Sequence, residues 1–427
     1  MKHSGKVDQD DIVWARNVLL ASGRRTEREE VDAYRVLAQV GPAAYLPRLV
    51  SALLSLSYDT ARGERHPACL ALREEAVTAA RAVDPADSAR ADLLYRALDG
   101  YQRELYTLGR RAEGLAARAE MLSIGRAQAA ASGDLTVKGL RDWAAGLSEE
   151  GRHAEAADSL TEWVTAIRPD GPGDGSLAWS LLEWAAALDA AGLADQAGAA
   201  FEEIVSTETA DAANARGPMA CHLYALIRYA QMLDTRRQRE QATSVRREAL
   251  AVLTELAATG ERKSWSDYQA SFWSVLLAIS GAESERWAPR DPRPPFGAKP
   301  GQWSPDARRR YFDGREALRE EKDTLAQRAA MDPDRHLAEL VRVHRVLTVR
   351  SAVYWEFQTH LFPERTHLLF DEGVDLARRL FEHHPAHEAP ALVTALMDRS
   401  TFRAAAMEFG PALDDFSQAL HLLGEAG

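Results

Sequence analysis

Residues Gly151-Arg152-His153-Ala154-Glu155-Ala156 decide the fold, because the same short pattern returns three more times along the chain. Its counterparts are Gly109-Arg110-Arg111-Ala112-Glu113-Gly114, Gly192-Leu193-Ala194-Asp195-Gln196-Ala197 and Arg237-Gln238-Arg239-Glu240-Gln241-Ala242. The small residue that closes each pattern stands at positions 114, 156, 197 and 242, in steps of 42, 41 and 45 residues. Units that recur at a nearly constant spacing predict a tandem repeat.

The pattern has a physical meaning at each end. The glycine ends one helix, because it takes the left-handed conformation that a tight turn between two helices needs. The small residue five positions later lets the second helix lie close against the first. Near the C-terminus, Phe409, Ala412, Phe416 and Ala419 repeat the same face at spacings of three and four. The sequence therefore predicts antiparallel helix pairs stacked in series.

Composition extends this prediction to the whole chain. Helix-forming Ala, Leu, Glu and Arg dominate, and no stretch keeps the period of two that marks a strand. We expect an all-α fold, a right-handed solenoid of about nine antiparallel helix pairs that runs as one domain over residues 1–427. Its expected parts are a degenerate hairpin at 8–40, regular repeats at 43–264, a repeat at 265–331 with an insertion at 282–305, and C-terminal repeats at 335–424. The helix at 266–281 is expected to pair with a helix at about 306–330.

The alternation of small and large positions resembles the tetratricopeptide repeat (TPR), whose usual length is about 34 residues. The longer period here is similar to that of many actinobacterial regulatory proteins, as are the linkers at 41–47 and 332–340. The resemblance implies a TPR-like superhelix from a bacterium. It implies little about function, because such repeats bind many different partners.

Charge and cysteine content narrow the classes of partner and compartment. The formal net charge is −12, whereas a protein that binds duplex nucleic acid usually carries a basic excess. Cys69 and Cys221 lie in apolar helical stretches and are no disulfide framework. No stretch approaches the roughly 20 apolar residues of a membrane span. We expect a cytoplasmic protein that binds neither nucleic acid nor membrane, and a homodimer is left open.

Known catalytic and phosphate-binding motifs are absent from the sequence. The only local cluster of metal-ligand residue types is His383, His384, His387 and Glu388, and Pro385 interrupts its helical spacing. We therefore expect no catalytic residue, no cofactor and no metal.

The TPR resemblance implies that the first helix of each pair lines a concave face, which is the usual binding surface of a solenoid. By the family pattern, the groove positions lie thirteen, ten, six and three residues before each turn. A basic patch and a neighbouring aromatic patch follow, and the partner-binding residues expected there are Arg96, Arg103, Tyr106, Lys138, Arg141, Trp179, Tyr224 and Gln231. Such a surface suits a protein or peptide that is acidic and carries an apolar anchor.

The insertion adds Trp287, Phe296 and Trp303 to the expected binding residues, because its prolines exclude helix and its aromatic residues argue against simple disorder. It is either an arm that lies in the groove or a surface loop held to the solenoid by Trp287 and Trp303. Three functions stay open: a regulatory scaffold or adaptor, a peptide-responsive signal receptor, and an enzyme with a pocket in region 265–381. Aromatic residues would line that pocket: Trp265, Trp273, Trp287, Phe296, Trp303, Tyr354 and Trp355.

Overall fold

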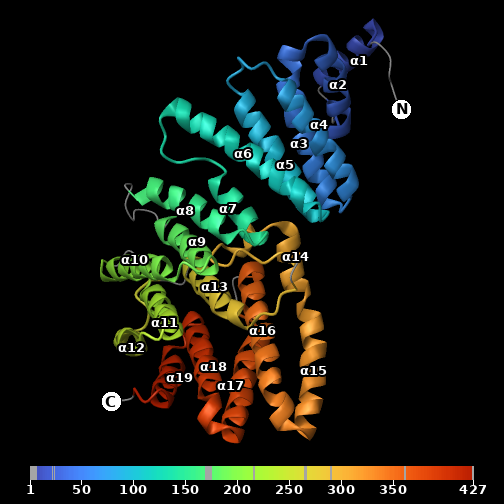
Figure 1. The fold of residues 1–427 in the computed structure, drawn as a ribbon. Helices are drawn as coiled ribbons and strands as arrows, with labels where there is room; N and C mark the ends of the chain where they lie inside the picture. Colours follow the sequence, from blue (N-terminus) through green and yellow to red (C-terminus); the bar gives the residue numbers. More distant parts are fainter. Residues whose placement is uncertain are drawn as a thin grey trace. The chain divides into compact units, whose positions relative to one another are not determined.

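The structure is a computed structural model, and it describes residues 7–21, 23, 25–168, 176–214, 217–263, 267–288, 291–359 and 362–425. Nineteen α-helices and no strand occur over these residues (Figure 1). The prediction of an all-α solenoid of helix pairs is confirmed. The chain divides into two compact units, Met1–Gly146 with Ser304–Asp306, and Leu147–Trp303 with Ala307–Gly427.

Unit 1 begins with three hairpins, in which each helix packs against the next along the chain. Capping boxes at Asp8 and Thr26 start the first two helices, and Pro42 starts the third. The helices are α1 (Gln9–Leu20), α2 (Glu27–Val40), α3 (Pro42–Arg62), α4 (His66–Ala82), α5 (Arg90–Thr107) and α6 (Arg111–Ser132), followed by α7 (Leu140–Glu149), which runs to the boundary of the unit.

Unit 2 continues the series with two regular pairs and then a less regular region. α8 (His153–Ile167) comes first, and the two pairs are α9 (Ser176–Ala190) with α10 (Ala194–Ala213) and α11 (Met219–Thr235) with α12 (Arg239–Thr259). The later helices are α13 (Asp267–Gly281), α14 (Pro305–Asp313), α15 (Arg315–Met331), α16 (Pro333–Thr359), α17 (Glu364–His383), α18 (Pro385–Ala405) and α19 (Phe409–Leu422), with short 3₁₀ turns at Ala282–Ser284 (η2) and Pro300–Gln302 (η3).

The four predicted turns share one backbone conformation. Gly109, Gly151, Gly192 and Arg237 have φ values of 74°, 74°, 77° and 61°, all in the left-handed region. The small residues five positions later are buried, as Ala156, Ala197 and Ala242 are 0% exposed. At Gly114 an added Cβ would lie 2.8 Å from the ring of Tyr106, so the two helices of this pair approach too closely for a larger side chain. The repeat pattern is therefore a packing pattern.

Replacing Arg237 by glycine is expected to raise the free energy of unfolding by about 0.5–1 kcal/mol. The left-handed conformation strains a residue with a Cβ, and this gain exceeds the entropy that glycine adds to the unfolded chain. The matched change Gly151→Ala should lower the same quantity by about 1 kcal/mol. Urea denaturation measures both variants, and a loss of stability in Arg237→Gly would contradict this account of the turn.

The region after residue 265 departs from the expected pairing. The helix expected at 306–330 is broken at Gly314 into α14 and α15, and α15 packs against α16. α13 packs instead against α11, α16 and α18. The reason lies in the side chains: α13 buries apolar residues around its whole circumference, whereas α15 is rich in charged residues and buries only Leu325 and Ala329. A helix with one narrow apolar stripe cannot enclose α13.

Candidate functional site

The four basic residues of the expected site lie in unit 1. Arg96 and Arg103 are exposed on α5, and their spacing of seven residues places them on one face of that helix. Lys138 lies in the turn before α7, not on the helix as expected, and its Nζ is 4.0 Å from the ring centre of Tyr95 on α5. Arg141 follows in the first turn of α7. The structure therefore brings Lys138 against the helix that carries the two arginines, and these four residues are called the basic face below.

The carboxylates beside Arg103 and Lys138 neutralise these two bases only weakly. Arg103 Nε lies 3.1 Å from Asp99, and its side chain is 61% exposed. Lys138 Nζ lies 3.9 Å from Asp92, and both side chains are at least half exposed. Exposed ion pairs of this kind contribute only about 0–1 kcal/mol. An acidic partner could therefore exchange places with these carboxylates at little cost.

Two expected binding residues are buried, which corrects the prediction for them. Tyr106 is 0% exposed, and the guanidinium of Arg118 lies 4.6 Å from its ring centre. Tyr224 on α11 is 2% exposed. Both rings fill contacts between packed helices, so neither offers a surface to a partner.

Residues 291–303 of the insertion, here called the strap, lie on the face of α9 that carries the expected groove positions. Gly297 has φ +102°, and an added Cβ would be 2.7 Å from both the carbonyl oxygen of Leu182 and the Cβ of Ala186. Lys299 Nζ lies 3.8 Å from the ring centre of Trp179, which is itself 9% exposed. The strap thus covers Trp179, which removes this ring from the surface available to a partner.

The aromatic residues of the insertion have different environments. Trp303 is 3% exposed, donates from Nε1 to the carbonyl oxygen of Ala298 at 2.9 Å, and packs edge-on against Tyr311 at 5.2 Å. Its burial makes it an anchor of the strap, which corrects its expected role as a binding residue. Trp287 and Phe296 are half-buried and line a cavity of about 390 Å³ that also reaches Ala186 of α9. Trp265 and the side chain of Trp355 lie outside the described residues.

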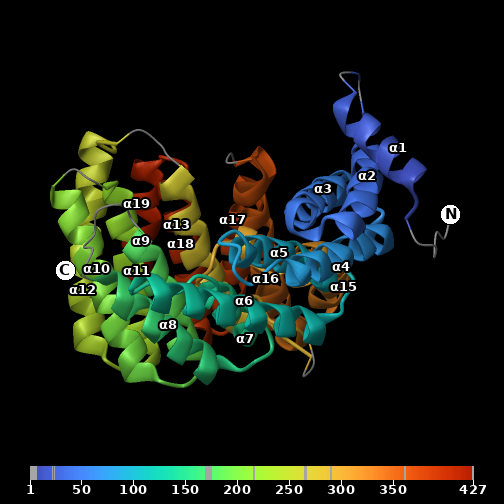
Figure 2. The ribbon, with the colours of Figure 1, turned by 90° about the horizontal axis from the view of Figure 1, so that it is seen from above.

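Unit 2 closes on itself through its last helix. α19 packs against α12, and the two run side by side in Figure 2. Arg246 of α12 bonds to Asp234 at 2.6 Å and forms a bidentate pair with Glu425, just beyond α19. The groove face of α11 consequently faces α18 and α19 across a pocket that is partly open to solvent.

That pocket has a volume of about 500 Å³ and is here called the inner cavity. Its α11 wall contains Gln231, an expected binding residue, with Ile227 and Asp234 of the same predicted face. Its opposite wall is largely apolar and comes from α18 and α19: Ala389, Pro390, Val393, Thr394, Met397, Phe416, Leu422 and Leu423. Gln231 is thus positioned to contact a ligand inside this cavity.

Two arginines of the inner cavity differ in how completely they are paired. Arg345 of α16 binds Asp398 of α18 at 2.8 Å and donates to Ser280 and Ser284, so each of its nitrogens has a partner. Arg228 of α11 is 5% exposed, yet its contacts are longer, at 3.3 Å to Gln231 and 3.2 Å to Glu283. Its Nε is buried and has no hydrogen-bond partner within the described part of the chain.

A second cavity, of about 380 Å³, lies between α16, α17 and α18 and is lined by His344, which is paired with a carboxylate outside the lining. His344, 1% exposed, lies 3.2 Å from Glu372, and Lys322 lies 3.1 Å from the same carboxylate. The hydrogen bond from His344, with help from Lys322, lowers the pKa of Glu372 to about 2. Glu372 therefore stays ionised near neutral pH and serves as an ion-pair partner, which does not favour its use as a general acid.

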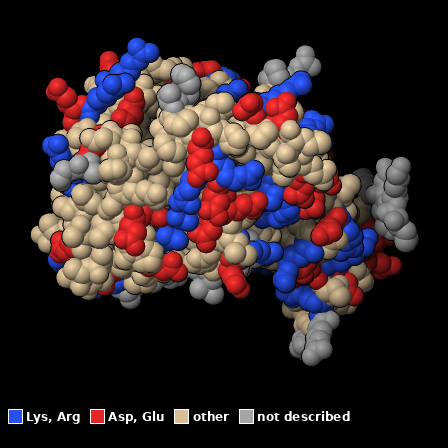
Figure 3. Space-filling model, turned by 90° about the horizontal axis from the view of Figure 1, so that it is seen from below, with Lys and Arg blue, Asp and Glu red and all other residues tan. Residues whose placement is uncertain are grey.

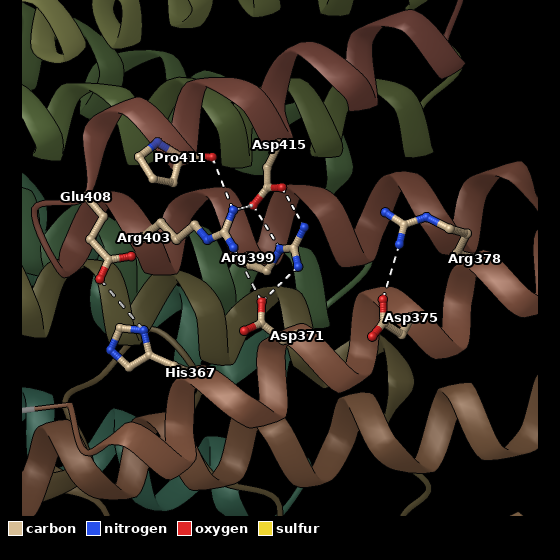
Figure 4. A network of polar contacts seen from close by, with 9 residues as sticks. All are labelled: His367, Asp371, Asp375, Arg378, Arg399, Arg403, Glu408, Pro411 and Asp415. Carbon is tan, nitrogen blue, oxygen red and sulfur yellow. Dashed lines mark hydrogen bonds and ion pairs between the residues drawn. The ribbon is translucent and has the colours of Figure 1, made fainter.

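A polar network fixes the last helix pair, which supplies the apolar wall of the inner cavity (Figure 4). Asp415 of α19 receives two bonds from Arg399, at 2.7 and 2.9 Å, and one from Arg403 at 2.9 Å. Arg399 also reaches Asp371 of α17 at 2.8 Å. Arg399 and Arg403 of α18 thus link Asp415 of α19, which is 3% exposed, to Asp371 of α17, so this wall has a defined position relative to α17.

Further features of the described residues bear on the binding of nucleic acid, membrane and metal. On the face seen in Figure 3, basic and acidic side chains alternate and a broad area carries neither, so no continuous basic field lies there. No helix among the described residues is both long and apolar enough to cross a membrane. The described residues also contain no group of three His, Cys, Asp or Glu that could hold a metal ion. His383 ends α17, and the side chain of His387 lies outside the description.

Sequence reasoning missed Arg228, although a signal was present. It is the only Lys, Arg, Asp or Glu between Met219 and Leu233, in a helix whose other residues are almost all buried. A lone charge in a helix that is buried all round must find partners or a ligand. Glu283 and Asp398 could not be found in this way, because their positions depend on contacts between distant repeats.

Comparisons with known proteins identify no family. No protein-family model and no curated protein matches the chain. The solved structure of BtubC (BKLC) from P. vanneervenii has 14% identity and a TM-score of 0.39, over 59% of this chain and 96% of that chain. A chain of Naa15/Naa10 bound to HypK-THB has 13% identity and a TM-score of 0.35, over 97% of this chain and 64% of that chain. The class that the fold defines is an all-helical repeat protein.

Proposed function

We propose that this repeat protein is a scaffold that binds an extended, acidic segment of a partner protein on the basic face of unit 1. The observation that carries the proposal is the contact of Lys138 with Tyr95, which adds a third base to the face of α5 that exposes Arg96 and Arg103. Exposed bases on α5 and in the turn before α7 suit a chain that presents carboxylates in series.

Unit 2 supports this function by analogy within the same chain. Trp179 occupies the repeat position of Arg96 and Lys138, and the strap, which contains no α-helix, lies across it. The face used for this position thus holds one segment without α-helix already. Because Tyr106, Tyr224 and Trp179 are covered, the proposal keeps the acidic character of the partner and drops the apolar anchor.

The repeat type and the cellular compartment of the protein are part of the same proposal. We propose a TPR-like protein of the long-period type seen in actinobacterial regulatory proteins, acting in the cytoplasm. The repeat spacing and the left-handed turns support this assignment, since a left-handed residue ends α5, α7, α9 and α11 at the same repeat position. A homodimer stays a prediction.

Charge reversal on the basic face tests the proposal. Affinity capture from the native cell would compare the wild-type chain with the double variant Arg96→Glu, Arg103→Glu. The control carries the same charge change at exposed sites on α3 and α6, Arg62→Glu and Arg126→Glu. We expect a specific protein bound by the wild type and the control, lost from the double variant, and released as salt screens the charges. Equal capture by all three proteins would contradict the proposal.

A further inference from the structure

The inner cavity of unit 2 contains a buried positive charge that the protein leaves incompletely paired. The Arg228 side chain is 6% exposed, and the only carboxylate within reach in the described residues is that of Glu283, at 3.2 Å. The Glu283 side chain is itself 59% exposed, so water competes for it. A buried guanidinium normally has closely paired, hydrogen-bonded partners, because removing an ion from water is expensive.

Other buried arginines of unit 2 show what full pairing looks like. Arg350 forms two short bonds to Glu285, at 2.8 and 2.6 Å, and a third to the carbonyl oxygen of Tyr311. Arg345 and Arg246 are paired with comparable completeness. Arg228 differs in having an unpartnered Nε and only two long bonds.

Arg228 borders three cavities. It lines the inner cavity, the strap-side cavity of about 390 Å³, and a small pocket of about 20 Å³ that lies against Trp273. The inner cavity itself, at about 500 Å³, falls within the range of small-molecule sites. Such sites combine apolar walls with a few polar groups that orient the ligand, as α18 and α19 do opposite Arg228.

We propose that the inner cavity binds a small organic monocarboxylate, whose carboxylate pairs with Nε and Nη2 of Arg228 and whose apolar body lies against Val393, Met397 and Phe416. The planar fork of a guanidinium matches a carboxylate in two parallel hydrogen bonds. Glu283 gives up its place at Nη2 and turns to solvent, where an exposed carboxylate is well hydrated.

The other charges that face the cavity favour a single negative charge on the ligand. Asp234 and Glu283 are acidic, while Arg239, Arg246 and Arg345 are basic. Arg246 and Arg345 are already neutralised by Asp234, Glu425 and Asp398. A phosphate dianion would meet the two acidic side chains of the wall, whereas a carboxylate adds only the charge that Arg228 lacks. This site is independent of the partner-binding face proposed for unit 1.

Binding of a graded acid series to the full chain tests the site. Straight-chain acids from butanoate to decanoate would be titrated by calorimetry, with the alcohols of equal length as uncharged controls. We expect the acids to bind more tightly than their alcohols and affinity to rise with chain length until the cavity is filled. An acetylated hexapeptide ending in a leucine carboxylate separates a free acid from the end of a polypeptide. Binding of either the acids or the peptide supports the carboxylate site.

Three variants test where the acid binds. Arg228→Gln should weaken acid binding about thirtyfold or more, which is the usual scale for removing one partner of a buried charge pair. Arg239→Gln, an exposed arginine of the same cavity, should change it by less than about threefold. Thr394→Phe fills the cavity without changing its charge and should abolish binding while the circular dichroism spectrum stays helical.

The proposal is overturned if neither the acids nor the peptide bind, if alcohols bind as tightly as acids, or if Thr394→Phe binds like the wild type. Equal acid binding by wild type and a folded Arg228→Gln variant also overturns it. Should Arg228→Gln fail to fold, the acid–alcohol comparison and Thr394→Phe decide the question.

Discussion

Raising the pH from about 4.5 to about 7 is expected to cost this protein about 3 kcal/mol of stability through one residue, Glu208. Glu208 of α10 is 1% exposed, and burial, with the nearby charge of Asp211, raises its pKa to about 7. Tyr268 donates to its carboxylate at 2.9 Å and opposes this rise without cancelling it. The folded state therefore holds a proton that the unfolded chain has already lost.

The sign follows from the raised pKa. The contribution of Glu208 is fully present below its unfolded pKa of about 4.5 and is lost as the pH rises through about 7. Glu208→Gln stays neutral and keeps an acceptor for Tyr268, so its stability should not fall over this window. Urea denaturation of both proteins across the window measures the difference, in which other titrating groups cancel. Parallel curves for the two proteins would contradict the predicted burial of this carboxyl.

Removing the anchor of the strap should be the most damaging change in the insertion. Trp303→Ala is expected to lower the free energy of unfolding by about 3–5 kcal/mol, because the ring is 3% exposed and packs against Phe296, Tyr311 and Phe312. Denaturant unfolding of unit 2 measures the loss. A change below about 1 kcal/mol would show that the strap contributes little to the fold.

Trp287→Ala is the matched control, since Trp287 is half-buried and should cost clearly less. Lys299→Ala removes only the contact with the ring of Trp179, a contribution of about 0.5–1 kcal/mol. This comparison also shows why deletion of the whole insertion is a poor test of binding. The deletion removes a core side chain together with the segment, so a loss of partner could reflect unfolding.

The turn conformation and the close helix packing within each repeat were predictable from the sequence, because both depend on residues close together in the chain. Gly109, Gly151 and Gly192 predict left-handed turns. The alignment of the repeats alone predicts the same conformation at Arg237. The small residue five positions later was predictable for the same reason, since it touches the helix just before the turn.

The site was harder to predict, because a groove position is defined by what lies opposite it. Tyr106 and Tyr224 occupy positions that the repeat pattern assigns to the concave face, but neighbouring helices cover both rings. Trp179 is covered by the strap, more than a hundred residues later in the sequence. The closure of α12 on α19, which creates the inner cavity, likewise leaves no trace in local periodicity.

Site-specific photo-crosslinking in the native cell tests the partner-binding claim most directly. A photoreactive side chain at Arg103 on the basic face would be compared with one at Ala116, an exposed position on the outer helix α6. The account predicts a discrete crosslinked protein from position 103, absent from position 116 and lost when Arg96→Glu is added. Crosslinks of equal yield and pattern from both positions, or none from position 103, would contradict it.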